Sequence, residues 1–261
     1  MNMKTNLHMK FANSDLSDDF AGWPPEATVF PIAGVDLRVL PGSHPFVLAE
    51  EAAIRENWAK ETAANPALFD GRLVFQQRLS FSEDGIAGEG YVTPFSAFMW
   101  WRRQPQRQGG LHIFAYPVLE SADGALVAIR MGAHTANPGQ VYFAAGSLEQ
   151  EDIVDGRCDI EANMRREVHE ETGLDLADAA AGPGLYASYS RRTVTLMRLL
   201  RFEMTADEIV KRIEAHMLVA EDKEIAGAVA IRSADPSAYP YNISMLPVIS
   251  WYFGKAGASE A

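Results

Sequence analysis

The sequence predicts an α/β protein, and three observations support this class. Stretches with the composition of strands alternate with stretches of good helix formers along most of the 261 residues. Apolar residues make up 48% of the chain, which is enough for a sizeable core, and the length fits one large domain or two of about 100–150 residues. Glycine and proline turn signals separate the stretches.

The first part of the chain has the weaker element signals. Residues 1–25 are polar and end in two prolines, so we expect part of this segment to be disordered. Strands are expected within residues 28–39 and over residues 73–82, where apolar positions alternate. A helix is expected over residues 47–62, since Pro45 suits a first helical position and good helix formers follow.

The second part of the chain gives clearer signals. Residues 102–110 have the glycine and proline content of a linker, so we expect a boundary there. After it, Asp123 and Gly124 form a hairpin signal between two apolar runs. Strands are expected at 112–119, 125–131, 141–143, 186–189, 193–202 and 225–231, and helices from Asp159, over 207–216 and within 240–251.

The charge balance argues against two classes of partner. The chain has 23 basic and 35 acidic residues, a formal charge of −12, which does not suit a nucleic-acid backbone or an anionic membrane. The single cysteine, Cys158, excludes an intrachain disulfide and fits a reducing compartment. The start lacks a signal-peptide core, and no run approaches the ~20 apolar residues that span a bilayer. We therefore expect a soluble, cytoplasmic protein.

The most informative stretch is residues 166–174, which read Arg-Glu-Val-His-Glu-Glu-Thr-Gly-Leu. At about 100° per residue, Glu167, Glu170 and Glu171 fall within an arc of roughly 100° on one helix. Like charges at such spacings repel each other by about 0.2–0.5 kcal/mol per pair, so a cation is expected in front of them. Mg²⁺ suits clustered carboxylate oxygens and usually accompanies a phosphate-bearing substrate.

This stretch resembles the second half of the Nudix hydrolase signature, Arg-Glu-aliphatic-x-Glu-Glu-x-Gly-aliphatic, at every fixed position. The first half departs from the family, because Cys158 stands where the signature has a glutamate and Asp152 where it has a glycine. A short insertion after a family-like start at Gly146 accounts for the difference. The carboxylates that could replace the missing glutamate are Glu149, Glu151, Asp155 and Asp159.

The resemblance implies a fold and a metal site. The fold is a mixed β-sheet sandwiched between helices, preceded here by a smaller Nudix-like α+β domain. In that family, carboxylates that match Glu167, Glu170 and Glu171 hold Mg²⁺ or Mn²⁺. The arginine that matches Arg166 fixes the catalytic glutamate by an ion pair.

The resemblance also implies a reaction, namely hydrolysis of a nucleoside diphosphate linked to another group. A metal neutralises phosphate oxygens and lowers the pKa of a bound water, and a nearby carboxylate takes the proton. In this family that base is a glutamate of the signature helix or an acid on a later loop. On the later loop, the candidates are Glu221, Asp222 and Glu224.

Three arginines are candidates for binding the nucleotide substrate, because a guanidinium fork can bond two phosphate oxygens at once. Arg191 and Arg192 open a predicted strand soon after the signature helix. Arg130 ends the return strand that borders the substrate pocket in Nudix folds. A solvated surface position is the alternative for each of them.

The aromatic pattern of residues 54–101 resembles the N-terminal region of UDP-sugar-hydrolysing Nudix proteins. In those, a Nudix-like domain without the signature precedes the catalytic domain. We therefore expect a polar segment over 1–25, a Nudix-like domain over 26–105 and a catalytic domain over 108–256, with a UDP-sugar-like substrate. The alternative for these aromatic residues is a purely structural core.

Other readings stay open. ADP-ribose is an alternative substrate, and so is a coenzyme A derivative, because Arg130, Gly139 and Phe143 resemble parts of a coenzyme A motif. A catalytically silent binding module is another alternative, because Cys158 replaces the expected glutamate. Homodimers are frequent in this family, so we also expect a homodimer unless two Nudix-like lobes in one chain replace that contact.

Overall fold

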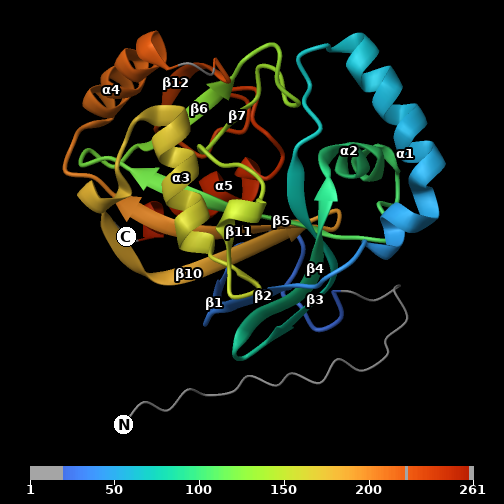
Figure 1. Ribbon diagram of the computed structural model, residues 1–261. Helices are drawn as coiled ribbons and strands as arrows, with labels where there is room; N and C mark the ends of the chain where they lie inside the picture. Colours follow the sequence, from blue (N-terminus) through green and yellow to red (C-terminus); the bar gives the residue numbers. More distant parts are fainter. Residues whose placement is uncertain (1–19, 221–222, 259–261) are drawn as a thin grey trace.

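The computed structural model describes residues 20–220 and 223–258, and its strands form two sheets (Figure 1). Within these residues the first sheet has seven strands in the order β1-β10-β11-β5-β6-β12, with β7 beside β6. β5 and β11 run parallel and the other neighbours antiparallel, so this sheet is mixed. The bounds are β1 (Phe30–Ile32), β5 (His112–Glu120), β6 (Leu126–Met131), β7 (Val141–Tyr142), β10 (Ala180–Ser190), β11 (Thr193–Arg201) and β12 (Ile225–Ile231).

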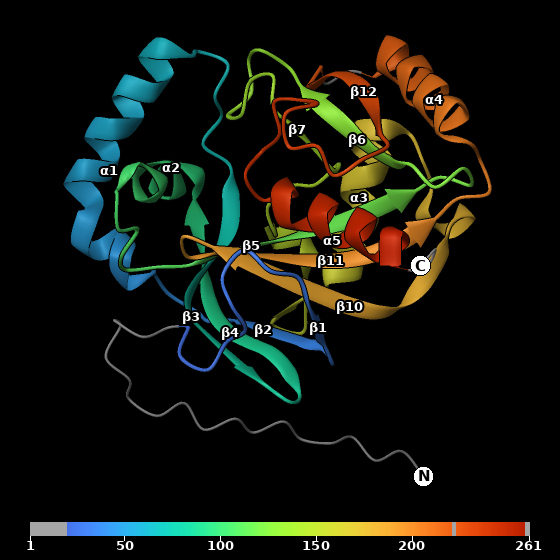
Figure 2. The same ribbon diagram turned by 180° about the vertical axis from the view of Figure 1, so that it is seen from behind.

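Helices cover both faces of the first sheet. α3 (Ile160–Thr172) lies on one face and α5 (Met245–Ala258) on the other, as the two opposite views show (Figure 1, Figure 2). Val168 of α3 and Val248 of α5 are buried in one core cluster with residues of the strands between them. α4 (Ala206–Val219) packs beside α3 and β12. The predicted class, a mixed sheet sandwiched between helices, is confirmed.

The second sheet is built mainly from the N-terminal part of the chain. Its five strands, all within the described ranges, have the order β3-β4-β2-β9-β8. α1 (Pro45–Ala64) and α2 (Phe95–Arg103) pack on each other at its side, around the buried rings of Phe75 and Trp101 (Figure 1). The strand bounds are β2 (Val35–Val39), β3 (Arg72–Ser82), β4 (Gly85–Pro94), β8 (Ile153–Val154) and β9 (Arg157–Cys158).

Each sheet contains strands from the other part of the chain. β1 pairs with β10 of the first sheet, with Pro31 opposite Tyr186. β8 and β9, which belong to the insertion before α3, extend the second sheet, with Arg157 opposite Arg38. The Arg157 guanidinium also lies 2.7 Å from the Asp36 carboxylate. Backbone pairing therefore holds the two sides of the expected linker together.

Two sequence expectations concern the membrane and the N-terminal segment. The described residues contain no helix that is both long and apolar enough to cross a bilayer. Of the expected polar segment, residues 1–19 lie outside the described part. The ring of Phe20 stacks on Tyr189 with centroids 4.3 Å apart, and Trp23 meets the same ring edge-on, so the end of this segment is packed on β10.

Candidate active site

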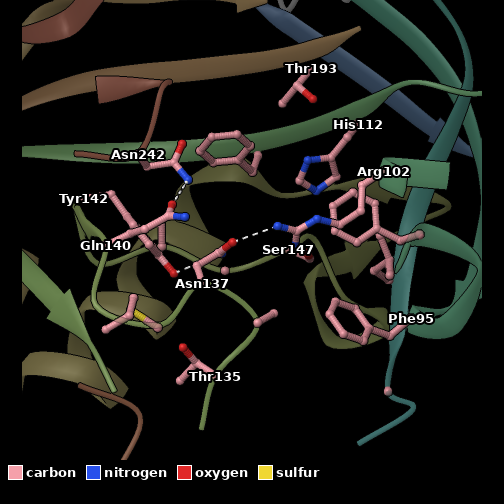
Figure 3. Close-up of a pocket in the computed structure, with 18 of the residues that line it drawn as sticks. Phe95, Arg102, His112, Thr135, Asn137, Gln140, Tyr142, Ser147, Thr193 and Asn242 are labelled. Carbon is pink, nitrogen blue, oxygen red and sulfur yellow. Dashed lines mark hydrogen bonds between the residues drawn. The ribbon is translucent and has the colours of Figure 1, made fainter. Parts of the chain in front are cut away.

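A cleft of about 700 Å³ lies between the two parts of the chain (Figure 3). One wall consists of residues 67–73, α2 and Arg107, which come from the N-terminal part and the expected linker. The opposite wall consists of the loop over 131–142, Gly146 and side chains of α3. The carboxylates of the predicted signature helix therefore face aromatic and basic side chains from the N-terminal part.

The ends of α3 are fixed as the sequence predicts. Asp159 is the N-cap, and its carboxylate accepts a hydrogen bond from the Ala162 N–H at 2.9 Å. Gly173 ends the helix in the left-handed region with φ of 67°, and its N–H donates to the His169 carbonyl. A Cβ there would lie 2.6 Å from Nδ1 of His216, so close packing by α4 adds a second reason for glycine.

Arg166 is held by a buried aspartate that the sequence analysis did not choose. Asp152 is 2% exposed, and its carboxylate oxygens lie 3.0 and 3.3 Å from Nη2 and Nε of Arg166. Asp152 also accepts hydrogen bonds from the Asn163 side chain at 2.9 Å and from the Glu149 N–H at 2.8 Å. Arg166 in turn lies 2.8 Å from Oε1 of Glu167. The supporting role predicted for Arg166 thus has a geometric basis.

The candidates for the missing signature glutamate have other surroundings. Glu151 and Asp155 are exposed, and Asp159 caps the helix. Glu149 is half-buried and lines the cleft, and burial raises the pKa of its carboxyl above the ordinary value. At Cys158, burial raises the pKa of the thiol to about 12, so it stays protonated at neutral pH. Asp152, which none of the predictions named as a replacement, supplies the ion pair to Arg166.

Glu167 lies in the wall of the cleft with little access to water. It is 8% exposed, and burial raises its pKa to about 8, an effect that Arg166 opposes and that Glu170 and Glu149 reinforce. A Cβ on Gly146 would overlap the Glu167 carboxyl, so only glycine allows the loop to approach it so closely. The sequence singled out both residues, and the structure brings them into contact.

Glu171 is the second carboxylate of α3 in the cleft wall. Burial raises its pKa well above the ordinary value, and the nearby charges of Glu167 and Glu224 raise it further, whereas the Ala145 N–H lowers it by hydrogen bonding. Its Oε2 atom is buried without a hydrogen-bond partner. A buried carboxylate oxygen without a donor is a site at which a cation would be strongly favoured.

The third helix carboxylate differs from these two. Glu170 is exposed, does not line the cleft, and lies 3.1 Å from Nη1 of Arg166. Among the acids expected on a later loop, Glu224 lines the cleft, whereas Glu221 and Asp222 lie outside the described residues.

The described residues contain no ready-made group of three or more His, Cys, Asp or Glu side chains spaced to hold a metal. The donors that are present still fit a hard cation, because Glu167 is buried, the charge of Glu167 acts on Glu171, and the buried Oε2 of Glu171 lacks a partner. The carboxylate oxygens of this pair suit Mg²⁺ or Mn²⁺ better than a softer metal.

The predicted arginines are placed differently from one another. Arg191 lines the cleft, and its backbone N–H donates to Oε1 of Glu26 at 2.7 Å. The Nε of Arg192 donates to the Gly110 carbonyl at 3.1 Å, and Arg192 does not line the cleft. Arg130 lies on β6 between β7 and β12 and is also outside the lining.

Three cleft arginines were missed by sequence reasoning, namely the exposed Arg72 and the pair Arg102 and Arg107. Arg102 and Arg107 belong to the stretch with a linker composition, where arginines are normally solvated. The available signal was the proximity of Arg102 to the aromatic run of residues 95–101, because arginine is often found against aromatic faces. In the structure Arg102 lies over the Phe98 ring, 5.8 Å from its centroid.

Aromatic residues form much of the remaining lining. Phe69, Phe95 and Phe98 come from the N-terminal part, and Tyr142 and Tyr241 from the opposite wall. The expectation that N-terminal aromatic residues build a core holds for Trp101, which is fully buried although it borders the cleft, whereas Phe69 is 81% exposed.

Comparisons with known proteins give structural likenesses only, since no family model and no curated protein sequence matches the chain. DR0079 from Deinococcus radiodurans is 14% identical, with a TM-score of 0.41 over 58% of this chain and 89% of that chain. A NUDIX hydrolase from Nitrosomonas europaea is 16% identical, with a TM-score of 0.36 over 57% and 90%. A C. elegans Ap4A hydrolase binary complex is 10% identical, with a TM-score of 0.40 over 56% and 98%. At such values the likeness carries no assignment of activity, which has to come from the cleft.

Proposed function

We propose that the protein is a Mg²⁺- or Mn²⁺-dependent hydrolase that cleaves the diphosphate bond of a nucleoside diphosphate linked to another moiety. The observation that carries this proposal is the pair of neighbouring carboxylates in the wall of a large cleft, the buried Glu167 and the half-buried Glu171. Their burial as neighbouring acids is unfavourable unless a cation joins them. The match of residues 166–174 to the Nudix signature supports the same chemistry.

Glu167 and Glu171 would hold the metal ion. When bound, such an ion supplies charge neutralisation of phosphate oxygens and a bound water of lowered pKa. Glu170, the third predicted ligand, is paired with Arg166 at the surface, and its recruitment would require that pair to open. Arg166 itself positions Glu167, because its guanidinium is clamped on the other side by Asp152.

A carboxylate must also accept the proton of the attacking water. Glu149 and Glu224 line the cleft and stand outside the proposed metal pair. Single glutamine variants of each distinguish them, since the true base should lower kcat at unchanged KM.

For the substrate, we propose a UDP-sugar-like molecule, with ADP-ribose as the alternative. The sequence pattern of the N-terminal part supports the former, and its aromatic side chains in the cleft offer faces on which a base could stack. A coenzyme A derivative has less support, because Arg130 is outside the cleft lining and Phe143 is fully buried in the core.

The test is product chromatography over UDP-sugars, ADP-ribose, NADH and acyl-coenzyme A with Mg²⁺. We expect turnover of at least one substrate and a loss of more than about 100-fold in Glu167→Gln and Glu171→Gln. Glu151→Gln is the matched control, because Glu151 is exposed on the insertion next to Asp152. Absence of turnover for every substrate, or full activity in both helix variants, would contradict the proposal.

A catalytically silent binding module is the second candidate. The replacement of the signature glutamate by Cys158, whose thiol stays protonated at neutral pH, favours it. Calorimetric titration separates the two candidates, since an enzyme should take up Mg²⁺ more tightly with a nucleotide present. Nucleotide binding that is indifferent to the metal would favour the module.

A further inference from the structure

Two adjacent arginines at the end of α2 have opposite surroundings. Arg103 turns toward α1, where its guanidinium bonds both carboxyl oxygens of Glu61 at 2.7 and 3.0 Å. Arg102 turns into the cleft and donates to Oδ1 of Asn137 at 2.9 Å (Figure 3). Because an amide oxygen carries no net charge, the half-buried Arg102 guanidinium has no counter-ion in this contact.

Arg107 and Arg191 line the same cleft. Arg107 lies 5.3 Å from the Trp101 ring centroid, and its Nη1 is 3.4 Å from Oγ1 of Thr193, but its Nε is buried without a partner. Arg191 is close enough to lower the pKa of Arg107, although burial is the larger cause. Among the described residues, neither guanidinium forms an ion pair with a carboxylate.

His112 adds an unpartnered polar atom to this end of the cleft. It is 8% exposed, and its Nε2 is buried without a hydrogen-bond partner. Burial lowers its pKa to about 3, and the charges of Arg102 and Arg107 contribute, so the ring is neutral and can donate one N–H to an anion. Figure 3 shows His112 and Arg102 on the same side of the cleft.

This basic end is separate from the carboxylates of α3. Among the described residues, no ion pair joins Arg102 or Arg107 to a carboxylate of α3, whereas Arg166 pairs with Glu167 and Glu170. Asn137 stands between Arg102 and Tyr142, because its Oδ1 accepts a hydrogen bond from Arg102 and its Nδ2 lies 3.5 Å from the Tyr142 hydroxyl (Figure 3). A diphosphate bound in front of α3 would therefore leave the arginines without an anion of their own.

We propose that Arg102, Arg107 and Arg191, with His112, form a second anion-binding site for a phosphate or carboxylate on the part of the substrate distant from the diphosphate. This inference rests on the proposed function for the position of the diphosphate. It narrows the substrate class to nucleoside diphosphate derivatives with an additional anionic group. A guanidinium fork bonds either anion in the same geometry, so the two chemical sources are separated by experiment.

The test uses pairs of substrates that differ by one peripheral anion. UDP-glucuronate is compared with UDP-glucose for a carboxylate, and coenzyme A with dephospho-coenzyme A or NADPH with NADH for a phosphate. In the wild-type protein we expect kcat/KM for the anionic member of at least one pair to exceed that of its partner by about tenfold or more, mainly through KM.

Variants then assign the preference to the arginines. Arg102→Gln and Arg107→Gln should lower kcat/KM for the anionic member much more than for the neutral member and so remove most of the preference, whereas Arg102→Lys should restore part of it. Arg103→Gln is the matched control, because Arg103 faces Glu61 and not the cleft; it should keep the preference. Equal rates within every pair in the wild type, or an equal loss for both members in the variants, would overturn the proposal.

A binding measurement separates this inference from the proposed function. Inorganic phosphate is titrated calorimetrically into the full chain in EDTA, where neither turnover nor a metal contributes. Wild type should bind phosphate about tenfold more tightly than Arg102→Gln or Arg107→Gln. If the wild type binds phosphate in this way but hydrolyses no substrate, the anion-binding site is supported and the hydrolase proposal is contradicted. If phosphate binding is equal or absent in all three proteins, the anion-binding site is contradicted.

Discussion

A single buried aspartate, Asp152, sets the orientation of the arginine in the candidate active site. Its two oxygens bond Nε and Nη2 of Arg166, which leaves Nη1 to face Glu167 and Glu170. A planar guanidinium fixed along one edge has no freedom to rotate, so Glu167 has a defined partner.

We expect Asp152→Asn to weaken both stability and activity. The amide can donate where the carboxylate accepted, so Arg166 keeps at most one good bond, at a cost of about 1–3 kcal/mol in the free energy of unfolding. Urea denaturation and kcat/KM measure the two effects, with Glu151→Gln as the exposed neighbour for comparison. Wild-type activity in Asp152→Asn would mean that Arg166 does not depend on this clamp.

Gly146 provides a second test at the residue scale. A methyl group there overlaps the Glu167 carboxyl, so Gly146→Ala should displace Glu167 and lower kcat by about tenfold or more. Gly227→Ala is the matched control, because a Cβ on Gly227 meets nothing within 4 Å. Similar kcat values for both variants would show that Glu167 can move without consequence.

The pH dependence of stability follows from Glu167. Burial raises its folded-state pKa to about 8, whereas an unfolded glutamate titrates near about 4.3. The stability that the protonated side chain contributes is therefore present below about pH 4.3 and is lost as the pH rises through about 8. His112, with a folded-state pKa of about 3, acts in the opposite direction and only below about pH 6.5.

In EDTA we therefore expect the free energy of unfolding to fall between about pH 6.5 and 8.5. Glu167→Gln should reduce this slope and leave the part due to Glu171, whose pKa is also raised, and Mg²⁺ should oppose the slope in the wild type. Urea titrations across the range provide the measurement, and a slope shared by wild type and variant would contradict the assignment.

At the residue scale, the sequence predicted the chemical groups of the site better than the residues that contact them. Glu167 and Glu171 were expected on one face because the helix period relates their positions, and Gly146 was expected as the start of the signature loop; all three line the cleft. Asp152 and Arg102 were not expected, since an insertion and a separate part of the chain bring them there. Their contacts depend on tertiary pairing, which local spacing does not encode.

At the scale of elements, the insertion before α3 is a β-hairpin. β8 and β9 are joined by Asp155 and Gly156, with φ of 50° and 73°. Asp-Gly is the usual pair for such a two-residue turn, so a local signal was present in the sequence. The hairpin follows the short helical turn that carries Asp152, and the Asp159 N–H donates to the Asp152 carbonyl at 2.7 Å.

Gly156→Val should therefore destabilise the hairpin by about 1–2 kcal/mol, because a β-branched residue resists the left-handed conformation. We expect a decrease in kcat as well, since the strands hold the segment that contains Asp152. Asp155→Asn is the control, because asparagine tolerates this conformation. Thermal denaturation and kcat are the measurements; if the Val variant matched the Asn variant, the turn would not support the site.

Elements with strong local signals were predicted, and those shaped by packing were not. α1, α3 and β5 match their expected ranges closely. β4 and α2 were missed, because the glycines of β4 weaken its strand pattern. Gly88 and Gly90 leave room for the side chains of Leu79 and Gln76 on the paired strand, a requirement that no local pattern reveals.

At the scale of the whole molecule, the cleft depends on both parts of the chain. A fragment that starts at residue 106 lacks α2, β1 and the sheet on which β9 pairs. We expect this fragment to aggregate, because without β1 one side of β10 is an unpaired sheet edge. Circular dichroism and light scattering test this, and a soluble, folded fragment with full activity would contradict it.

The domain limits and the homodimer stay predictions at this scale. The expected limits separate the chain near residues 105–108, while strands from each side complete the sheet of the other. Light scattering coupled to gel filtration measures the oligomeric state of the full chain. We expect the mass of a dimer, unless the N-terminal part already occupies the surface that a second subunit would use.

Each of the two sheets contains strands from the other part of the chain, and this arrangement limits how such a protein could diversify. Because β9 of the catalytic part pairs with β2 of the N-terminal part, the loop that carries Asp152 takes its shape from the neighbouring sheet. Recombination that swaps the N-terminal part for a relative's would change the substrate wall and disturb the Arg166 clamp together. New specificity would therefore arise more readily by point changes in the cleft, at positions such as Arg102 and Phe69, than by exchange of whole modules.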